Sequence, residues 1–237
     1  MRRLLVLASL LASACGSTGQ DVATFPIHGA GAGEATFESN GWSVTIERAD
    51  VAFGPVYFCA TSFADMDVCP AAEAEWLGTA SIDALDTAPQ MLGEASAITA
   101  TVRSAMFDYG RSWLLTAERP RANEGAPRGR SAVFVARAMK DGVTLEVRAS
   151  LDIDPANAGQ SAVIGAPTGE EAIEGDEALT VRVDPAAWWR RVDLDAVARM
   201  DADGDGVVEL ARGDVPYEAL VLAMTAGSLP RFEWTQP

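Results

Sequence analysis

Hydrophobic and polar residues alternate along much of this chain, and the clearest case is the segment 143–153. Its odd positions hold Val, Leu, Val, Ala, Leu and Ile, and every even position holds a polar residue. Successive side chains of a β-strand point to opposite faces, so this pattern predicts a strand with one buried face. Shorter runs predict further strands at 42–46, 51–59, 131–139, 178–183 and 232–234.

The turns between these segments favour antiparallel pairing. Lys140-Asp141-Gly142 joins the strands predicted at 131–139 and 143–153, and Asp-Gly tolerates the positive φ of a tight hairpin turn. Gly54-Pro55 predicts a bulge or a break within 51–59. Short strands separated by Gly- and Pro-rich turns are typical of a sandwich or a barrel. The predicted fold is therefore mainly β, an antiparallel β-sandwich.

The pattern changes at Asp184, and a short C-terminal helical segment carrying an Asp-rich loop is predicted over 185–227. Asp184 followed by Pro185 is a typical N-cap and first helical position. Further helices are predicted at 194–200 and 217–225.

The first fifteen residues resemble a bacterial lipoprotein signal. Arg2 and Arg3 form a charged region, 4–11 is a short apolar run, and Ala12-Ser13-Ala14 stands directly before Cys15. The same small residues satisfy the rule for ordinary secretion, which is the alternative. We predict that 1–14 is a cleaved signal peptide and that Cys15 is lipidated.

Residues 15–33 are predicted to be the lipidated N-terminus with a flexible tether, and 34–237 a single β-rich domain. Gly16 follows the cysteine, and no Asp there indicates inner-membrane retention. Resemblance to Gram-negative lipoproteins therefore implies a lipid anchor in the outer membrane, on a face that the sequence leaves open. No other stretch approaches the ~18 consecutive apolar residues of a membrane-spanning helix.

The chain is strongly acidic, with 18 basic and 34 acidic residues. Loss of Arg2 and Arg3 with the signal leaves 16 basic residues against 34, a net charge of −18. Nucleic acid is excluded as a partner because phosphate binding needs a basic face. An acidic surface suits solubility or cations, and a protein or glycan partner stays open.

Cys59 and Cys69 are the two remaining cysteines. Outside the cytoplasm a lone pair of cysteines usually forms a disulfide. A redox-active pair would have C-x-x-C spacing, and a zinc site would need more Cys or His than the chain holds. We predict a structural disulfide.

The strongest chemical motif is D-A-D-G-D-G-V-V-E at 201–209. Carboxylates at alternate positions converge on one point when the chain wraps around a hard cation, and Gly206 permits the sharp turn. We predict calcium as the cofactor, with these ligands: Asp201, Asp203, Asp205, the carbonyl of Val207, Glu209 and Asp214.

Over these nine residues the motif resembles the calcium loop of EF-hands and dockerin modules. An EF-hand has a bidentate acid at loop position twelve, where this chain has Arg212, and Asp214 is the predicted substitute. The resemblance therefore implies a structural calcium site and not the helix-opening switch of sensor EF-hands. A metal-free turn of Asp and Gly residues is the alternative.

No catalytic constellation stands out, and we predict no catalytic residues and no enzyme activity. His28 is the sole histidine, and no G-x-S-x-G serine is present. The run G-A-G-A-G at 29–33 lacks the Lys and Ser/Thr of a phosphate loop and is predicted to be a flexible turn. The arginine-bearing segment 119–130 is predicted to be a solvated loop.

The segments GWSVTIERADVAFGPVYFC and WWRRVDL, with Cys69 and the late acidic loop, resemble predicted lipoproteins of myxobacteria and relatives. The resemblance covers most of 34–237, but that group has no established activity to transfer. More remotely, the chain resembles the methanobactin-associated periplasmic proteins, β-rich copper proteins that can bind calcium. Those proteins use histidines and an oxidised tryptophan for copper, so His28 alone implies no copper ligand set.

The predicted function is that of an outer-membrane-anchored lipoprotein with a structural calcium site, acting as a binding or structural module. The alternative is a periplasmic metal-handling protein of the copper-associated kind.

Overall fold

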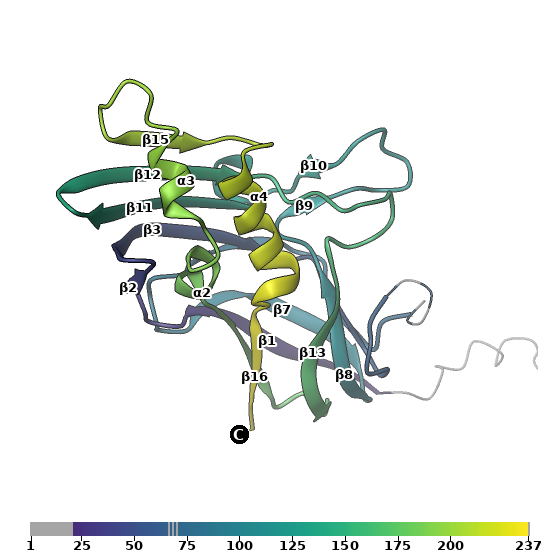
Figure 1. The fold of residues 1–237 in the computed structure, drawn as a ribbon. Coiled ribbons are helices and arrows are strands. Elements are labelled where there is room, and N and C mark those ends of the chain that lie inside the picture. Colours follow the sequence, from purple (N-terminus) through teal and green to yellow (C-terminus); the bar gives the residue numbers. More distant parts are fainter. Residues whose placement is uncertain (1–20, 66, 68, 70, 237) are drawn as a thin grey trace, which may run out of the picture.

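The structure, a computed structural model, describes residues 21–65, 67, 69 and 71–236. Two sheets pack in a sandwich-like arrangement with a short helical segment near the C-terminus, which confirms the predicted mainly β class. Figure 1 shows the helices gathered over one end of the molecule. None of the helices in the described part of the chain has the length and apolar character needed to cross a membrane.

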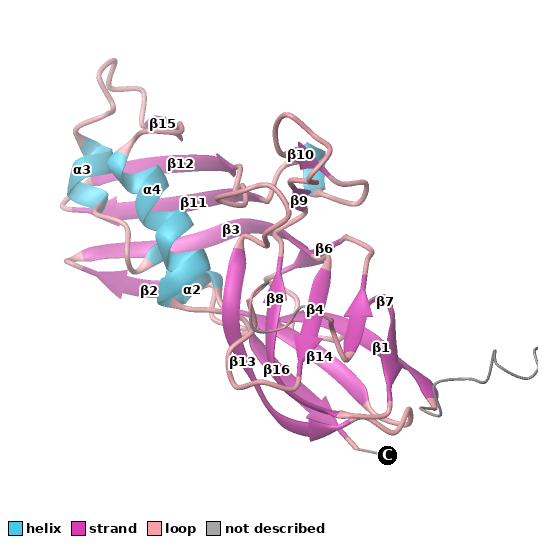
Figure 2. Cartoon of the chain, turned by 90° about the vertical axis from the view of Figure 1, so that its right-hand side faces the viewer, coloured by secondary structure: helices cyan, strands magenta, loops and turns pink. Residues whose placement is uncertain are grey.

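The larger sheet has eight strands, and its two end strands curl toward each other (Figure 2). Trp234 in one end strand donates a 3.0 Å hydrogen bond from Nε1 to the carbonyl of Thr168 in the other. In spatial order the strands are β13 (Val163–Ala172), β8 (Thr101–Phe107), β4 (Val56–Cys59), β5 (Ala74–Trp76), β7 (Gln90–Ile98), β1 (Val22–Gly31), β14 (Ala178–Val183) and β16 (Arg231–Thr235).

The second sheet has six strands, and a separate two-stranded pair lies beside it (Figure 1). Its order is β15 (Val207–Leu210), β12 (Val143–Leu151), β11 (Ala132–Lys140), β3 (Trp42–Phe53) and β2 (Thr36–Ser39), with β6 (Ala80–Asp83) also on β3. The small pair is β9 (Arg111–Ser112) with β10 (Arg121–Ala122), followed by the 3₁₀ turn η1 (Pro127–Gly129).

The helices lie over one face of the second sheet (Figure 2). They are α2 (Pro185–Trp189), α3 (Leu194–Ala198) and α4 (Val215–Leu222), which continues into the π-helical turn η2 (Ala223–Gly227). Trp188 and Trp189 are fully buried and meet the Phe134 ring of β11 edge-on, at centroid distances of 6.1 and 6.0 Å. Two buried indoles therefore pack α2 against the sheet. Replacing either tryptophan by Ala should lower the free energy of unfolding by roughly 3–5 kcal/mol.

Several local predictions are confirmed. Asp184 accepts a hydrogen bond from the Ala187 amide and caps α2. Asp141 and Gly142 have φ of 51° and 84° in the hairpin turn between β11 and β12. Gly54 and Pro55 separate β3 from β4.

The predicted tether is wrong for Val22–Gly31, which form β1 inside the larger sheet, between β7 and β14. Phe25 and Ile27 are 1% and 0% exposed, so the strand contributes to the core. The glycine-rich run is likewise packed. A Cβ added at Gly31 would lie 2.0 Å from the Ala84 carbonyl oxygen, so the close approach of these backbones requires glycine.

Two strand pairs depart from the predicted antiparallel order, because β1 pairs with β14 and β12 pairs with β15 in parallel. Between β12 and β15 the chain passes through β13 and β14 of the larger sheet and then through α2 and α3, a connection long enough for parallel pairing.

The disulfide is present: Cys59 at the end of β4 is bonded to Cys69, with Cα atoms 5.9 Å apart. Both residues are buried beside Met106 of β8. The bond therefore fastens the segment after β4 to the outer side of the larger sheet.

Candidate functional site

The Asp-rich loop connects α3 to β15. Gly204 and Gly206 have φ of 71° and 77°, a left-handed conformation that side chains other than glycine's rarely adopt. The exit from the loop is fixed because β15 begins at Val207 and pairs with β12. The Gly206 carbonyl accepts a 2.7 Å hydrogen bond from the amide of Glu146 on β12.

The loop brings together three of the predicted ligands. One carboxylate oxygen from each of Asp201, Asp203 and Asp205 lies within 4.8 Å of the others. The Gly206 amide donates to Asp201 Oδ2 at 3.2 Å, and the Val207 amide donates to Asp205 Oδ1 at 2.8 Å. Asp201 Oδ1 is a buried oxygen with no hydrogen-bond partner within the described residues. Three converging carboxylates are the donor set that calcium prefers.

Two predicted ligands do not join this cluster. Glu209 stands on β15 and faces Arg148 of β12, with Oε1 3.3 Å from Nη1. Asp214 accepts a hydrogen bond from the Ala211 amide at 2.7 Å, in the turn that opens α4. Arg212, at the EF-hand's last ligand position, pairs with Asp154 at 2.8 Å. The chain enters a strand directly after the loop, so it does not wrap back as an EF-hand does.

A second candidate site, which the sequence did not predict, is a pocket of about 1110 Å³ against β4, β5 and β8. Residues 113–117, 121–123 and 159–161 form the opposite wall. Leu114 and Leu115 line it while remaining 65% and 82% exposed, and Leu77 is 63% exposed. Its other large hydrophobic lining residues are Pro55, Tyr57, Met106 and Trp113.

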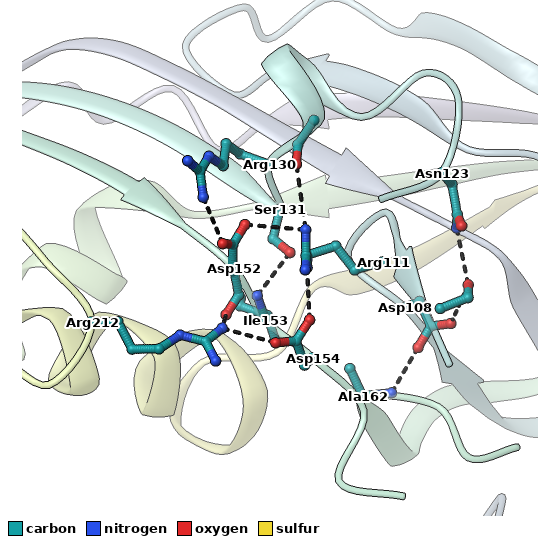
Figure 3. A network of polar contacts seen from close by, with 12 residues as sticks. Asp108, Arg111, Asn123, Arg130, Ser131, Asp152, Ile153, Asp154, Ala162 and Arg212 are labelled. Atoms are coloured by element: carbon teal, nitrogen blue, oxygen red, sulfur yellow. Dashed lines mark hydrogen bonds and ion pairs between the residues drawn. The ribbon is translucent and has the colours of Figure 1, made fainter. Parts of the chain in front are cut away.

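Asp108, directly after β8, is a buried carboxyl in this pocket, only 3% exposed. Its Oδ2 accepts a hydrogen bond from Ser112 Oγ at 2.9 Å, and Oδ1 accepts from the Ala162 amide at 2.7 Å. Asn123 Nδ2 donates in turn to Ser112 Oγ at 3.0 Å (Figure 3). It also donates to Thr79 Oγ1 at 3.2 Å.

Burial raises the pKa of Asp108 to about 6, although the hydrogen bonds from Ala162 and Ser112 oppose the shift. Tyr57 lies close by on β4, and its pKa is raised by burial and by the charges of Asp108 and Glu75. Within the part of the chain that the structure describes, no cation pairs with Asp108.

An ion-pair network stands beside the pocket (Figure 3). Arg111 bridges Asp154 at 2.7 Å and Asp152 at 3.3 Å, while Arg130 pairs with Asp152 at 2.6 Å. Burial acts to raise the pKa of Asp154, but hydrogen bonds from Arg111 and Arg212 hold it below its usual value. The network connects β9 to the end of β12 and to the turn before α4. It therefore positions β9, which leads into the wall of the pocket opposite β4, β5 and β8.

Segment 119–130 is exposed at all four of its arginines, as predicted for a solvated loop, and it also forms part of the pocket wall. It contains β10 and η1, and Arg121 and Asn123 line the pocket. The available sequence signal was the pair Leu114-Leu115 in a polar stretch. The rest of the lining comes from segments far apart in the chain, which no local pattern brings together.

The remaining candidate residues lie elsewhere. His28 is half-buried on β1, opposite Met91 of β7, and no metal-binding group in the described residues includes it. The copper-associated alternative thus stays a prediction from resemblance. Cys15 lies outside the described residues. No family model, curated protein or solved structure matches the chain.

Proposed function

We propose that this chain is an exported, lipid-anchored binding protein whose pocket takes a small, largely apolar molecule, and whose Asp-rich loop holds a structural calcium ion. The observation that carries the binding role is the pocket of about 1110 Å³ with Asp108 buried inside it. Ligand sites are typically concave and apolar, with a few polar groups that orient the ligand.

The exposed leucines support a bound apolar molecule. Leu77, Leu114 and Leu115 keep most of their surface in water, yet all three line one pocket. Covering a leucine side chain stabilises by roughly 1.5–3 kcal/mol. A ligand seated here gains that energy from several side chains whose positions the folded chain has already fixed.

Calcium in the Asp-rich loop would stabilise the connection between α3 and β15. The carboxylates of Asp201, Asp203 and Asp205 repel one another when no cation is present, and Asp201 Oδ1 has an unused lone pair. Figure 1 places β15 and the loop before it away from β9 and β10 at the pocket. We therefore assign the ion to the α3–β15 connection and not to ligand binding.

The lipid anchor is the predicted modification of Cys15. The Cys59–Cys69 disulfide supports an oxidising compartment, in which such bonds persist. An anchored module of this kind would hold its ligand at the membrane surface.

The test uses the mature chain with Cys15→Ser, so that no lipid competes for the pocket. The neutral fluorophore N-phenyl-1-naphthylamine should bind saturably, with one probe per chain. Replacing Leu114 and Leu115 together by Ser should weaken binding by at least about tenfold, which corresponds to about 1.4 kcal/mol. Leu222→Ser on α4, where Leu222 is 64% exposed, is the matched control. Absent or non-saturable binding, or equal loss in the control, would exclude the pocket as a ligand site.

A further inference from the structure

The buried carboxyl of Asp108 differs from the other sheltered acids of the molecule. Asp152 and Asp154 both have arginine partners. Glu177, 2% exposed, accepts hydrogen bonds from the amides of Glu174 and Gly175 within its own turn. Asp108 alone among these four combines burial, the lack of a cationic partner in the described residues, and a position in the wall of a large pocket.

Asp108 also keeps unused hydrogen-bonding capacity. Its oxygens accept one hydrogen bond each, from Ser112 and Ala162, whereas an ionised carboxylate offers about four acceptor positions. A buried charge is costly unless it is paired. A ligand that brings a cation and N–H donors into the pocket would supply both missing partners.

The charges around the pocket have the matching sign. Glu75 on β5 adds a second carboxylate. Tyr57 pairs with Glu75 across β4 and β5, and its partner on β8 is Met106, two residues before Asp108, so the three groups line the same wall of the pocket. Arg121 is the one basic residue among the described lining residues, and it is exposed on the opposite wall. Tyr57 and Trp113 also line the pocket, and aromatic rings attract cations.

We propose that the pocket selects an amphiphilic molecule with a protonated amine, its ammonium against Asp108 and Glu75 and its apolar body against Leu114 and Leu115. The inference rests on the proposed binding function and names its ligand class. The ammonium donates hydrogen bonds to the free acceptor positions of Asp108, and the hydrocarbon covers the exposed leucines.

Calorimetry of the Cys15→Ser chain at pH 7.5 tests this with three probes of equal chain length. Octylammonium should bind about tenfold more tightly than 1-octanol, and octanoate more weakly than both. Asp108→Asn should remove the preference for octylammonium over octanol while leaving octanol binding intact, which also shows that the variant folds. Glu75→Gln, at a partly exposed position, should reduce the preference.

The chain is acidic overall, so a general attraction for cations needs its own control. Glu38→Gln removes one exposed charge on β2, in the other sheet, and should leave the preference unchanged. Equal affinity for octylammonium and octanol, or a preference that survives Asp108→Asn, would overturn the inference and leave the binding function standing. Failure of all three probes to bind would overturn both.

Discussion

Ser112 Oγ donates a 2.9 Å hydrogen bond to Asp108 Oδ2, and it accepts one from Asn123 Nδ2 at 3.0 Å. The hydroxyl thus connects the buried carboxyl of Asp108 to the pocket wall that contains Asn123. Because Asn123 also reaches Thr79, the wall and the acid are positioned by one chain of hydrogen bonds. This arrangement makes the ionisation of Asp108 measurable through stability as well as through binding.

We predict that Asp108 opposes stability as pH rises. Its native pKa of about 6 lies above the ordinary 3.8, so the native state binds more protons than the unfolded chain between these values. Raising the pH from 4 to 7.5 should therefore lower the free energy of unfolding of the wild type by up to roughly 3 kcal/mol more than that of Asp108→Asn. Denaturant titration of both proteins at the two pH values measures the difference.

Glu75, Tyr57 and Arg121 line the same pocket and are present in both proteins, so the comparison isolates the carboxyl of Asp108. Glu38→Gln, on the distant strand β2, is the control. The difference in free energy of unfolding between this variant and the wild type should be small and the same at both pH values. A difference between the wild type and Asp108→Asn that does not change with pH would contradict the prediction.

We predict that Arg111→Met destabilises the fold by about 2–4 kcal/mol. The Arg111 side chain is 15% exposed and serves both Asp152 and Asp154, so its loss leaves sheltered carboxylates short of a partner. Arg137→Met is the matched control, because its pair with Glu47 is 49% and 37% exposed and contributes less than about 1 kcal/mol. Urea unfolding should separate the two variants clearly, and equal effects would mean that the network adds little.

We predict that replacing Cys59 and Cys69 together by Ser lowers the free energy of unfolding by about 2–5 kcal/mol. Because Cys69 and Ala71 line the pocket, the same variant should also bind the neutral fluorophore more weakly. Urea unfolding and probe titration measure the two effects. Unchanged probe affinity would show that the disulfide stabilises the fold without shaping the pocket.

We predict that calcium raises the thermal stability without exposing a new apolar surface. At a concentration one hundred times its dissociation constant, an ion that binds only the native state adds about 2.7 kcal/mol. Asp203→Ala should remove most of this gain, whereas Glu94→Ala, at an exposed position of β7, should not. Melting curves in millimolar calcium and in chelator measure it. Coincident curves would identify the loop as an ordinary turn, and a rise in hydrophobic dye binding would indicate a switch.

We predict that Cys15 carries the lipid anchor. Mass spectrometry of the mature N-terminus should find a modified cysteine, and Cys15→Ser should move the protein from the membrane to the soluble fraction. An unmodified thiol at Cys15 would favour ordinary secretion.

Features that depend on neighbouring residues could be predicted from the amino-acid sequence. The period of two located β12, and Asp141-Gly142 located its hairpin, because both reflect backbone geometry over a few residues. Asp184 marked the start of α2, since a cap is a contact within one turn. The same holds for Asp201, Asp203 and Asp205, which converge because they share one tight loop.

Contacts between segments that are distant in the sequence could not be predicted, because they depend on how the strands are ordered in the folded chain. The G-A-G-A-G run predicts a flexible turn, but contact with Ala84 makes Gly31 a packed position in a central strand. Glu209 lies apart from the carboxylates of Asp201, Asp203 and Asp205 because pairing with β12 places it beside Arg148. Tyr57 lines one pocket with Asp108 and Leu115 although it is far from both in the sequence. A local sequence pattern cannot predict such a contact, because the contact depends on strand order.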